Sequence, residues 1–346
     1  MSRYQILPAD PTRDEQGMLG VLNRNLLHTT PERLKWNQAG GARWWLAREQ
    51  ESQTIVGICG LIPRRFSLAG KMVKAGVAID LAVDQAHRGF GLATQLEKES
   101  LAAMQDLGYV LLYAVPNENS EPVLSKVGYR HLGALPRYTK IMRTQYQTDV
   151  FLPPQKLTRH LAKPLDWMLA KVSPERGFQR LPGWSVEMPA RLDGRFDRLW
   201  EQAVSRHAVL GERTSAFLKW RYADAPEQAY KIFAVCNPDR ELAGYVVYYL
   251  RENICRIADI FCRDEGASLH CLMSEFLKRA RSEGVFSVTT RYLGNSLLAR
   301  RLKHFGFSLR SGGASRVIVY QNPAANSAMP AAGVSVWYFL DGDNDI

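Results

Sequence analysis

The chain has 346 residues, of which 46% are hydrophobic and 23% are charged, and it carries a formal net charge of +11. This length exceeds the usual size of one compact domain and predicts two. The composition is that of a folded protein, and no apolar run approaches the roughly 20 residues that span a bilayer. The charge suggests anionic partners, and nucleic acid, a membrane surface or a phosphorylated cofactor would each satisfy it.

The five cysteines and the N-terminus together predict a cytoplasmic protein. The cysteine count is odd and includes no C-x-x-C pair, which favours buried free thiols over disulfides or a metal site. The seven histidines are scattered, so we expect no zinc site. The N-terminal residues turn polar at Pro8 and do not form the apolar core of a signal peptide.

Residues 1–143 alternate strand-like and helix-like segments. Thr30 and Pro31 have the residue types of a helix N-cap and first helical position, and Gly108 is typical of a helix C-cap. The expected elements, in chain order, are a strand at 4–7, helices at 14–27 and from Thr30, strands at 44–49, 55–67 and 73–83, a helix at 92–107, an apolar strand at 109–115, a short helix ending at Val127, and a strand toward Met142. We interpret 1–143 as one α/β domain.

Residues 144–183 interrupt this alternation. Prolines divide the segment, and between Lys140 and Arg180 there are eight Lys and Arg against three Asp and Glu. The apolar residues among these charges would suit a helix on a membrane surface or against a partner. A linker that packs its apolar side on the protein's own domains also explains them, and we favour that interpretation.

Residues 184–320 repeat the order of the first domain. We expect strands at 184–188, 230–236, 243–250, 255–262, 285–292 and near 317–320, with helices at 196–207, 269–282 and 295–304. Short words recur as well: residues 30–36 resemble residues 214–220, and Asn117 and Asn295 each precede a Gly-aromatic pair by 11 residues. Matching words in matching order indicate duplication of one α/β unit.

Residues 321–346 close the chain. A low-complexity stretch predicts a flexible spacer over 321–333. Residues 334–340 are apolar and aromatic, and they predict a strand that packs back on the body. Asp341, Asp343 and Asp345 could hold a cation or an amine, but a solvated acidic terminus is the simpler expectation.

The segment 79–94 has the order strand, short loop, glycine-rich turn and helix start. Gly89 and Gly91 would let backbone N–H groups approach a ligand, and the helix start adds unpaired donors and partial positive charge. Arg88 supplies a full charge at the entrance. No Gly-Lys-Ser/Thr follows as in a Walker loop, and the Rossmann pattern lacks its third glycine. The turn predicts a diphosphate site, and the alternative is a tight turn with glycines for packing only.

This segment resembles the pyrophosphate motif R/Q-x-x-G-x-G/A of the GNAT acyl-CoA N-acyltransferases, matched here by Arg88, Gly91 and Ala93. The surrounding order is similar to that family as well, with a strand before the motif, a long helix after it, and a strand that ends near Asn117. The resemblance implies an α/β fold of two GNAT-like units, each a twisted, mostly antiparallel sheet with flanking helices. The second unit, at 184–320, would be degenerate.

The resemblance also implies how acetyl-CoA or another acyl-CoA would bind as co-substrate. Backbone groups of Leu81, Ala82 and Val83 would pair with the pantetheine arm as an added strand does. The N–H groups of Phe90, Gly91, Leu92, Ala93 and Thr94 would hold the pyrophosphate, and Arg88, Gly89 and Asn117 would complete the site. The amine would attack the thioester directly, while a backbone N–H near a bulge in the strand stabilises the oxyanion.

The residues leave the proton donor and acceptor open. Many relatives place a tyrosine four residues before the glycine of the Gly-aromatic pair, where this chain has Leu124. That role would pass to Ser125, Tyr113 or water. Asp80 is the candidate catalytic base, although it could equally hydrogen-bond the neighbouring loop, and a water relay would need no carboxylate.

The second unit lacks the cofactor motif. Asp264 and Glu265 stand where the glycine-rich turn should be, and they would repel a diphosphate. Tandem chains of this kind resemble bacterial acyltransferases that modify amino sugars of surface polysaccharides, which implies a small-molecule amine acceptor. Trp36 and Trp220 would then either stack on a sugar or pack in the core, and core packing is the simpler expectation.

Two other functions fit the same residues. An aminoacyl-tRNA-dependent transferase can be built from two GNAT-like units, and a non-catalytic acyl-CoA- or nucleic-acid-binding module would keep the fold alone. Nucleic acid is disfavoured as a partner, because 144–183 is the one segment that approaches an interleaving of basic and aromatic residues.

Overall fold

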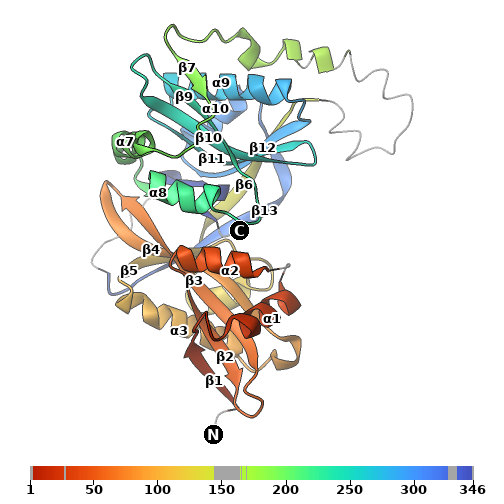
Figure 1. Cartoon of the computed structure of the whole chain (residues 1–346), viewed down its shortest axis with the longest axis vertical. Helices are drawn as coiled ribbons and strands as arrows, with labels where there is room; N and C mark the ends of the chain where they lie inside the picture. Colours follow the sequence, from red (N-terminus) through yellow and green to blue (C-terminus); the bar gives the residue numbers. More distant parts are fainter. Residues whose placement is uncertain are drawn as a thin grey trace.

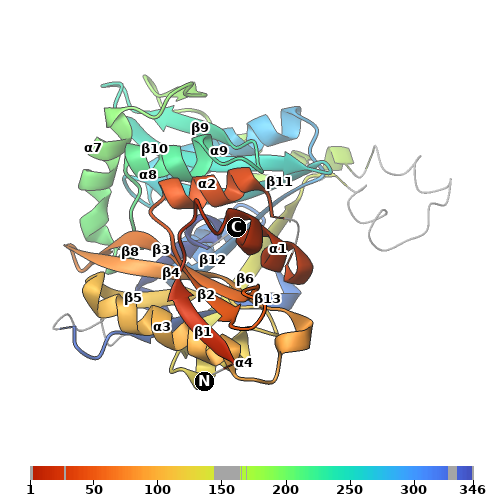
Figure 2. The ribbon, with the colours of Figure 1, turned by 60° about the horizontal axis from the view of Figure 1, so that its bottom comes forward.

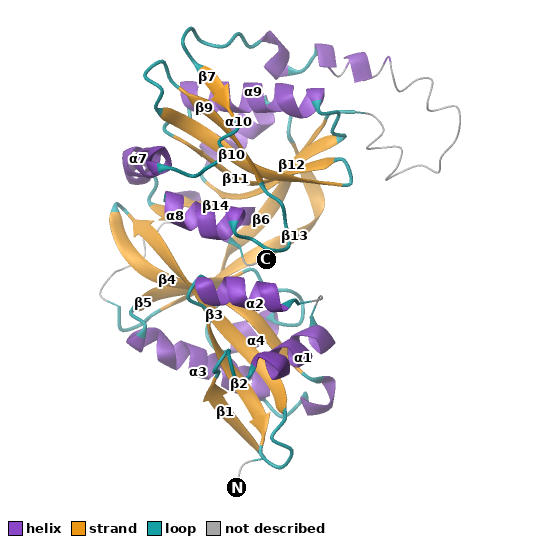
Figure 3. Cartoon of the chain, in the orientation of Figure 1, coloured by secondary structure: helices purple, strands orange, loops and turns teal. Residues whose placement is uncertain are grey.

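The computed structural model describes residues 3–26, 29–143, 164, 166–168, 170–325 and 333–344. Within these residues, one sheet of 14 strands runs through both halves of the chain, with helices packed along it (Figure 1, Figure 3). The first half forms one end of the molecule, the second half forms the other, and the C-terminus lies between them (Figure 1). This mixed sheet with flanking helices confirms the predicted fold class.

The first half follows the predicted order. Its elements are β1 (Tyr4–Pro8), α1 (Glu15–Asn25), α2 (Pro31–Ala39), β2 (Arg43–Glu49), β3 (Ile55–Leu68), β4 (Lys71–Val83), the 3-10 turn η1 (Gln85–His87), α3 (Leu92–Asp106), β5 (Tyr109–Ala114), α4 (Glu121–Lys126) and β6 (Arg130–Ile141). The Thr30 hydroxyl accepts a hydrogen bond from the Arg33 N–H and caps α2, as predicted. The Trp44 side chain packs in the hydrophobic cluster that includes residues of α1, and the next side chain, Trp45, packs in the cluster that includes residues of α3. The sheet is therefore covered on both faces.

The second half repeats the order of elements of the first half and adds two strands, Val209–Gly211 and Trp337–Leu340. Its strands are β7 (Ser185–Glu187), β8 (Val209–Gly211), β9 (Lys231–Cys236), β10 (Leu242–Arg251), β11 (Ile254–Cys262), β12 (Ser287–Gly294), β13 (Ser308–Gln321) and β14 (Trp337–Leu340), and its helices are α7 (Gly194–Ala203), α8 (Ser215–Leu218), α9 (Ala267–Ser282) and α10 (Ser296–His304). Sequence reasoning missed β8 and α8. It also made β13 too short, because β13 extends across both halves.

The last strands of the two halves are exchanged. β13 pairs with β5, β13 also pairs with β6, and β6 pairs with β12, all in antiparallel ladders. Thus β6 from the first half lies beside β12 of the second half, and β13 from the second half lies beside β5 of the first half. The hydrogen-bonded sheet therefore continues past both proposed domain boundaries.

The two similar segments, residues 30–36 and 214–220, contact each other between the halves. The indole rings of Trp36 and Trp220 stack with centroids 5.0 Å apart, and each indole N–H donates to the other residue's carbonyl oxygen, at 2.6 and 2.9 Å. The buried guanidinium of Arg64 lies 4.8 Å above the Trp220 ring. Trp36 is buried and Trp220 is half-buried against the core, and each ring covers the other, as the core-packing alternative expected. Figure 2 shows α2 and α8, which carry the words, close together.

The C-terminal segment is part of the core. β14 pairs with β12 in an antiparallel ladder and with β8 in a parallel one. Asp343 is 3% exposed, and its carboxylate forms an ion pair with the buried Arg213 at 2.6 Å. Asp341 lies 3.7 Å from Arg291, and Asp345 lies outside the described residues. The expectation of a solvated acidic terminus is therefore wrong for Asp343, because a buried arginine requires its charge.

Much of the linker, residues 144–163, 165 and 169, lies outside the described residues, as do residues 326–332 of the spacer. The membrane-surface hypothesis therefore rests largely on residues that are not described. The linker's end packs on the second half, where the buried Glu175 pairs with Lys140 at 3.1 Å and with Arg281 at 3.0 Å. None of the described helices is both long and apolar enough to cross a membrane.

Candidate active site

The turn between β4 and α3 has the geometry of an anion-binding loop. Gly89 and Gly91 have positive φ angles of 86° and 76°, which glycine adopts without strain. Gly91 is the N-cap of α3. Within the described part of the chain, none of the backbone N–H groups of residues 89–94 donates a hydrogen bond to the protein. These unpaired donors lie at the positive end of a helix, where an anion would be stabilised.

A cavity of about 470 Å³ opens beside this turn. Its lining includes all but one of the residues predicted to bind the cofactor: Leu81, Ala82, Val83, Arg88, Gly89, Gly91, Leu92, Ala93, Thr94 and Asn117. The exception is Phe90, whose exposed ring packs against Tyr4 and Arg3. The Arg88 guanidinium is held at the cavity by hydrogen bonds to the Val83 carbonyl and the Asn25 side chain, both at 3.0 Å.

The strands β4 and β5 diverge next to this cavity. They pair in parallel from Lys74 to Val77 on β4, while the other edge of β5 pairs with β13 from Leu111 to Ala114. The edge of β4 from Ala78 to Val83 is thus left without a strand partner in the described structure. A bulge interrupts the ladder with β3 at Asp80, which has a φ of 58°.

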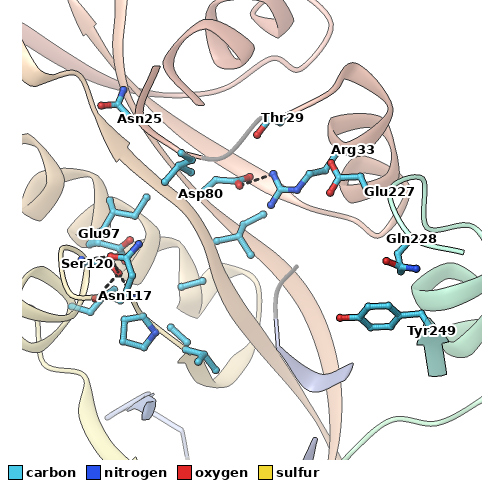
Figure 4. A pocket seen from close by; sticks show the side chains of 18 of the residues that line it. Asn25, Thr29, Arg33, Asp80, Glu97, Asn117, Ser120, Glu227, Gln228 and Tyr249 are labelled. Carbon is cyan, nitrogen blue, oxygen red and sulfur yellow. Dashed lines mark hydrogen bonds and ion pairs between the residues drawn. The ribbon is translucent and has the colours of Figure 1, made fainter. Parts of the chain in front are cut away.

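A larger cavity of about 740 Å³ continues from the first, and both are lined by Asn25, Leu26, Leu81, Asn117 and Ser120. Figure 4 shows its walls, with Glu97, Asn117 and Ser120 on one side and Glu227, Gln228 and Tyr249 on the other. The second wall comes from the second half of the chain. Sequence reasoning missed it because no motif in β9 or β10 marks residues that become neighbours through tertiary packing.

Asp80 lies at the bulge between the two walls. Its carboxylate is fully buried, with one oxygen 3.0 Å from the Arg33 guanidinium and the other 2.9 Å from the Trp44 indole nitrogen. Both oxygens thus accept a hydrogen bond, as the structural alternative for this residue expected, although the partners lie on α2 and β2. The catalytic role of Asp80 stays a prediction.

Glu97 on α3 is a second carboxylate at the cavity, and sequence reasoning missed it. It is 1% exposed, lines the larger cavity, and accepts a hydrogen bond from the Ser100 hydroxyl at 3.4 Å. Burial raises the pKa of Glu97 to about 7. The signal in the sequence was a glutamate at a position where the helical pattern places apolar neighbours such as Leu96.

The structure separates the candidates for the proton donor. The Tyr113 hydroxyl is buried in the core and donates to the Asp343 carbonyl at 2.6 Å, away from both cavities. Ser125 is exposed and lines neither cavity. Ser120 lines both cavities, with its hydroxyl 3.2 Å from the Asn117 side chain. Among the described residues with a side-chain hydroxyl, Ser120 is the one that lines both cavities.

The matching place in the second half is filled by the protein itself. The Asp264 carboxylate accepts hydrogen bonds from the backbone N–H groups of Gly266 and Ser268, at 2.9 and 3.3 Å, and from the Ser268 hydroxyl. A carboxylate therefore sits on the donors that a phosphate would need. We expected Asp264 and Glu265 to repel a diphosphate at this position, and the Asp264 carboxylate occupies the donors there.

Comparisons with known proteins agree with this geometry. Residues 12–132 match the acetyltransferase (GNAT) domain as a family, and no curated protein sequence matches the chain. Three solved structures share the fold. They are a probable N-acyltransferase of unknown function from Enterococcus faecalis (TM-score 0.69, 13% identity, covering 92% of this chain and 72% of that chain), a GCN5-related N-acetyltransferase from Anabaena variabilis (0.66, 14%, 92% and 72%), and an N-myristoyltransferase from Saccharomyces cerevisiae with bound myristoyl-CoA (0.58, 13%, 97% and 85%).

Proposed function

We propose that the protein moves an acyl group from an acyl-CoA, with acetyl-CoA as the simplest donor, to a primary amine, since residues 12–132 match the acetyltransferase (GNAT) domain as a family. The observation that carries this proposal is the turn at residues 89–94, with its unpaired backbone donors beside the cavity of about 470 Å³. A diphosphate in that cavity would accept hydrogen bonds from the turn, and Arg88 would add a full charge.

The rest of the donor would follow the open edge of β4. An extended pantetheine arm has amide groups that can pair with Leu81, Ala82 and Val83 as an added strand does. The thioester would then lie at the bulge, where the smaller cavity meets the larger one. A backbone N–H at the bulge can stabilise the oxyanion as the amine attacks, so no covalent enzyme intermediate is required.

Proton transfer needs a group whose pKa lies near the working pH. Glu97 meets this requirement because burial raises its pKa to about 7 and it lines the larger cavity. The Asp80 carboxylate is instead engaged by Arg33 and Trp44, and these interactions hold the bulge in place. We propose Glu97 as the proton acceptor, Asp80 as a positioning residue, and the Ser120 hydroxyl as the donor to the departing thiolate.

We propose an amino sugar as the acceptor. The rings of Tyr230 and Tyr249 lie edge to face with centroids 5.4 Å apart on the far wall of the larger cavity. Gln228 and Glu227 lie on the same wall as Tyr249 (Figure 4). Apolar ring faces with a few polar groups suit a compact polyhydroxylated ligand. The buried free cysteines support the proposed cytoplasmic location.

Calorimetric titration with acetyl-CoA tests the donor site. We expect a dissociation constant of about 1 μM to 1 mM, the usual range for enzyme substrates. Ala93→Glu places a carboxylate in the phosphate position on regular helical backbone, and it should weaken binding about a hundredfold, or about 2.7 kcal/mol. Ala267→Glu, an exposed alanine in the first turn of α9 in the second half, is the control and should leave binding unchanged.

Equal effects of the two substitutions would contradict the assigned site. Absence of acetyl-CoA binding, together with tight and salt-sensitive binding of tRNA, would instead support the aminoacyl-tRNA-dependent alternative. An acceptor screen with amino sugars, polyamines and amino acids, read by release of the free thiol, then tests the amine.

A further inference from the structure

Four arginines lie side by side on one face of the central sheet, and we call them the arginine row: Arg256, Arg291, Arg137 and Arg310. Arg310 on β13 is directly opposite Arg137 on β6, and Arg137 is directly opposite Arg291 on β12. Opposite residues in an antiparallel ladder share a face, with Cβ atoms about 5 Å apart. Arg256 on β11 pairs with Thr289, two residues before Arg291 and therefore on the same face.

The arginine row has few partners of its own. In the described part of the chain, its one ion pair joins Arg291 to Asp341 at 3.7 Å. The Nε atoms of Arg256 and Arg310 are buried and make no hydrogen bond. Like charges directly opposite one another destabilise a sheet, and buried donors without acceptors do so as well. Four like charges on one face with one nearby carboxylate, Asp341, make a surface that a bound anion would stabilise.

The row begins at the wall of the larger cavity. Arg256 is directly opposite Tyr249 in the ladder between β11 and β10, and Tyr249 lines that cavity together with Arg251. This wall lines the larger cavity, whereas the turn that would bind the CoA diphosphate lines the smaller one. An anion on the row would thus belong to the acceptor side of the site.

We propose that the arginine row binds a phosphate or diphosphate group of the acceptor, so that the acceptor is an anionic, phosphate-bearing amine. This inference rests on the proposed function and deepens it. Guanidinium groups form paired hydrogen bonds with phosphate oxygens, and four of them with one neighbouring carboxylate leave an excess of positive charge that suits a diphosphate. The phosphate would be held outside the cavity, with the sugar against Tyr249 and the amine at the bulge in β4.

Inorganic pyrophosphate is the probe, titrated calorimetrically into the full chain after saturation with acetyl-CoA, which occupies the other diphosphate site. Arg137→Gln should weaken pyrophosphate binding at least tenfold. Arg130→Gln, at an exposed arginine earlier on β6, removes the same charge outside the row and should change binding less than twofold. Arg137→Gln should also leave the midpoint of urea unfolding unchanged or raise it, because it relieves the repulsion along the row.

Equal weakening by the two variants, or no pyrophosphate binding in 150 mM salt, would overturn the proposal. Acetyl-CoA binding is measured separately on each variant and should not change. If acetyl-CoA fails to bind at all, the proposed function fails, while the contrast between Arg137→Gln and Arg130→Gln still reports on the row. Acetate replaces pyrophosphate in a last titration, and binding as tight as that of pyrophosphate would contradict a phosphate-selective site.

Discussion

Strands β4 and β5 in the first half and strands β11 and β12 in the second diverge in the same way, but the two openings have different contents. β11 and β12 pair from Ile254 to Ile257 and then separate, as β4 and β5 do after Val77. In the second half, β14 fills the gap: it pairs with β12, and the Tyr338 hydroxyl donates to the Ile260 carbonyl on β11 at 2.5 Å. The first gap keeps its cavity. In the second half, the chain itself thus occupies the place that stays open in the first half.

The two halves also share a buried carboxylate at the corresponding strand. Asp80 on β4 and Asp259 on β11 both lie at an irregularity in the ladder, and each is paired with an arginine, Arg33 at 3.0 Å and Arg213 at 3.3 Å. The second half keeps this pair although its opening is filled. The carboxylate therefore has a structural role in both halves, which supports our choice of Glu97 over Asp80 as proton acceptor.

The largest expected effect tests how firmly β14 fills the second opening. Asp343→Asn removes the nearer of the two carboxylates that pair with the buried Arg213 and leaves it with Asp259 alone, at 3.3 Å. Breaking a buried ion pair in this way should lower the free energy of unfolding by about 3 to 5 kcal/mol. Urea unfolding measures this change. Asp224→Asn breaks an exposed pair with Lys219 and should lower stability by about 0 to 1 kcal/mol. Similar small losses in both variants would show that β14 is weakly held.

A smaller, pH-dependent effect tests the open cavity. Burial raises the pKa of Glu97 to about 7, so the folded state holds its proton where the unfolded state, near 4.5, has released it. Stability from this group is therefore present below pH 4.5 and is lost as the pH rises through about 7. At one unit per about 1.4 kcal/mol, Glu97→Gln should gain on the order of 3 kcal/mol over wild type at pH 8.

Thermal unfolding at pH 5 and pH 8 measures the Glu97 effect. The exposed Glu99 on the same helix is the control, and Glu99→Gln should show no such pH dependence. The acyl-transfer rate provides an independent reading, because loss of the proton acceptor should remove the fall in rate below pH 7. A variant with the stability and rate profile of wild type at both pH values would show that Glu97 is not the ionising group.

The sequence predicted the first opening better than the second. The glycines, Arg88 and the helix start are consecutive, so their spacing alone placed the turn, and the words around Trp36 and Trp220 indicated the duplication. The exchange of β6 and β13 could not be predicted, because an antiparallel strand has the same residue pattern in either sheet. The place of β14 and the wall from Tyr230 and Tyr249 depend on packing between distant segments, which no local pattern encodes.

The smallest expected effect tells apart the two features that would block an acyl-CoA in the second half, namely the Asp264 carboxylate and β14. Asp264→Ala frees the backbone donors of Gly266 and Ser268 at the start of α9, and loss of such a cap should lower stability by about 1 kcal/mol. We expect calorimetry to find a single acetyl-CoA per chain still, because β14 occupies the space that a pantetheine arm would need. A second bound acetyl-CoA would mean that one carboxylate alone keeps the duplicate site closed, and that β14 can leave the gap between β11 and β12.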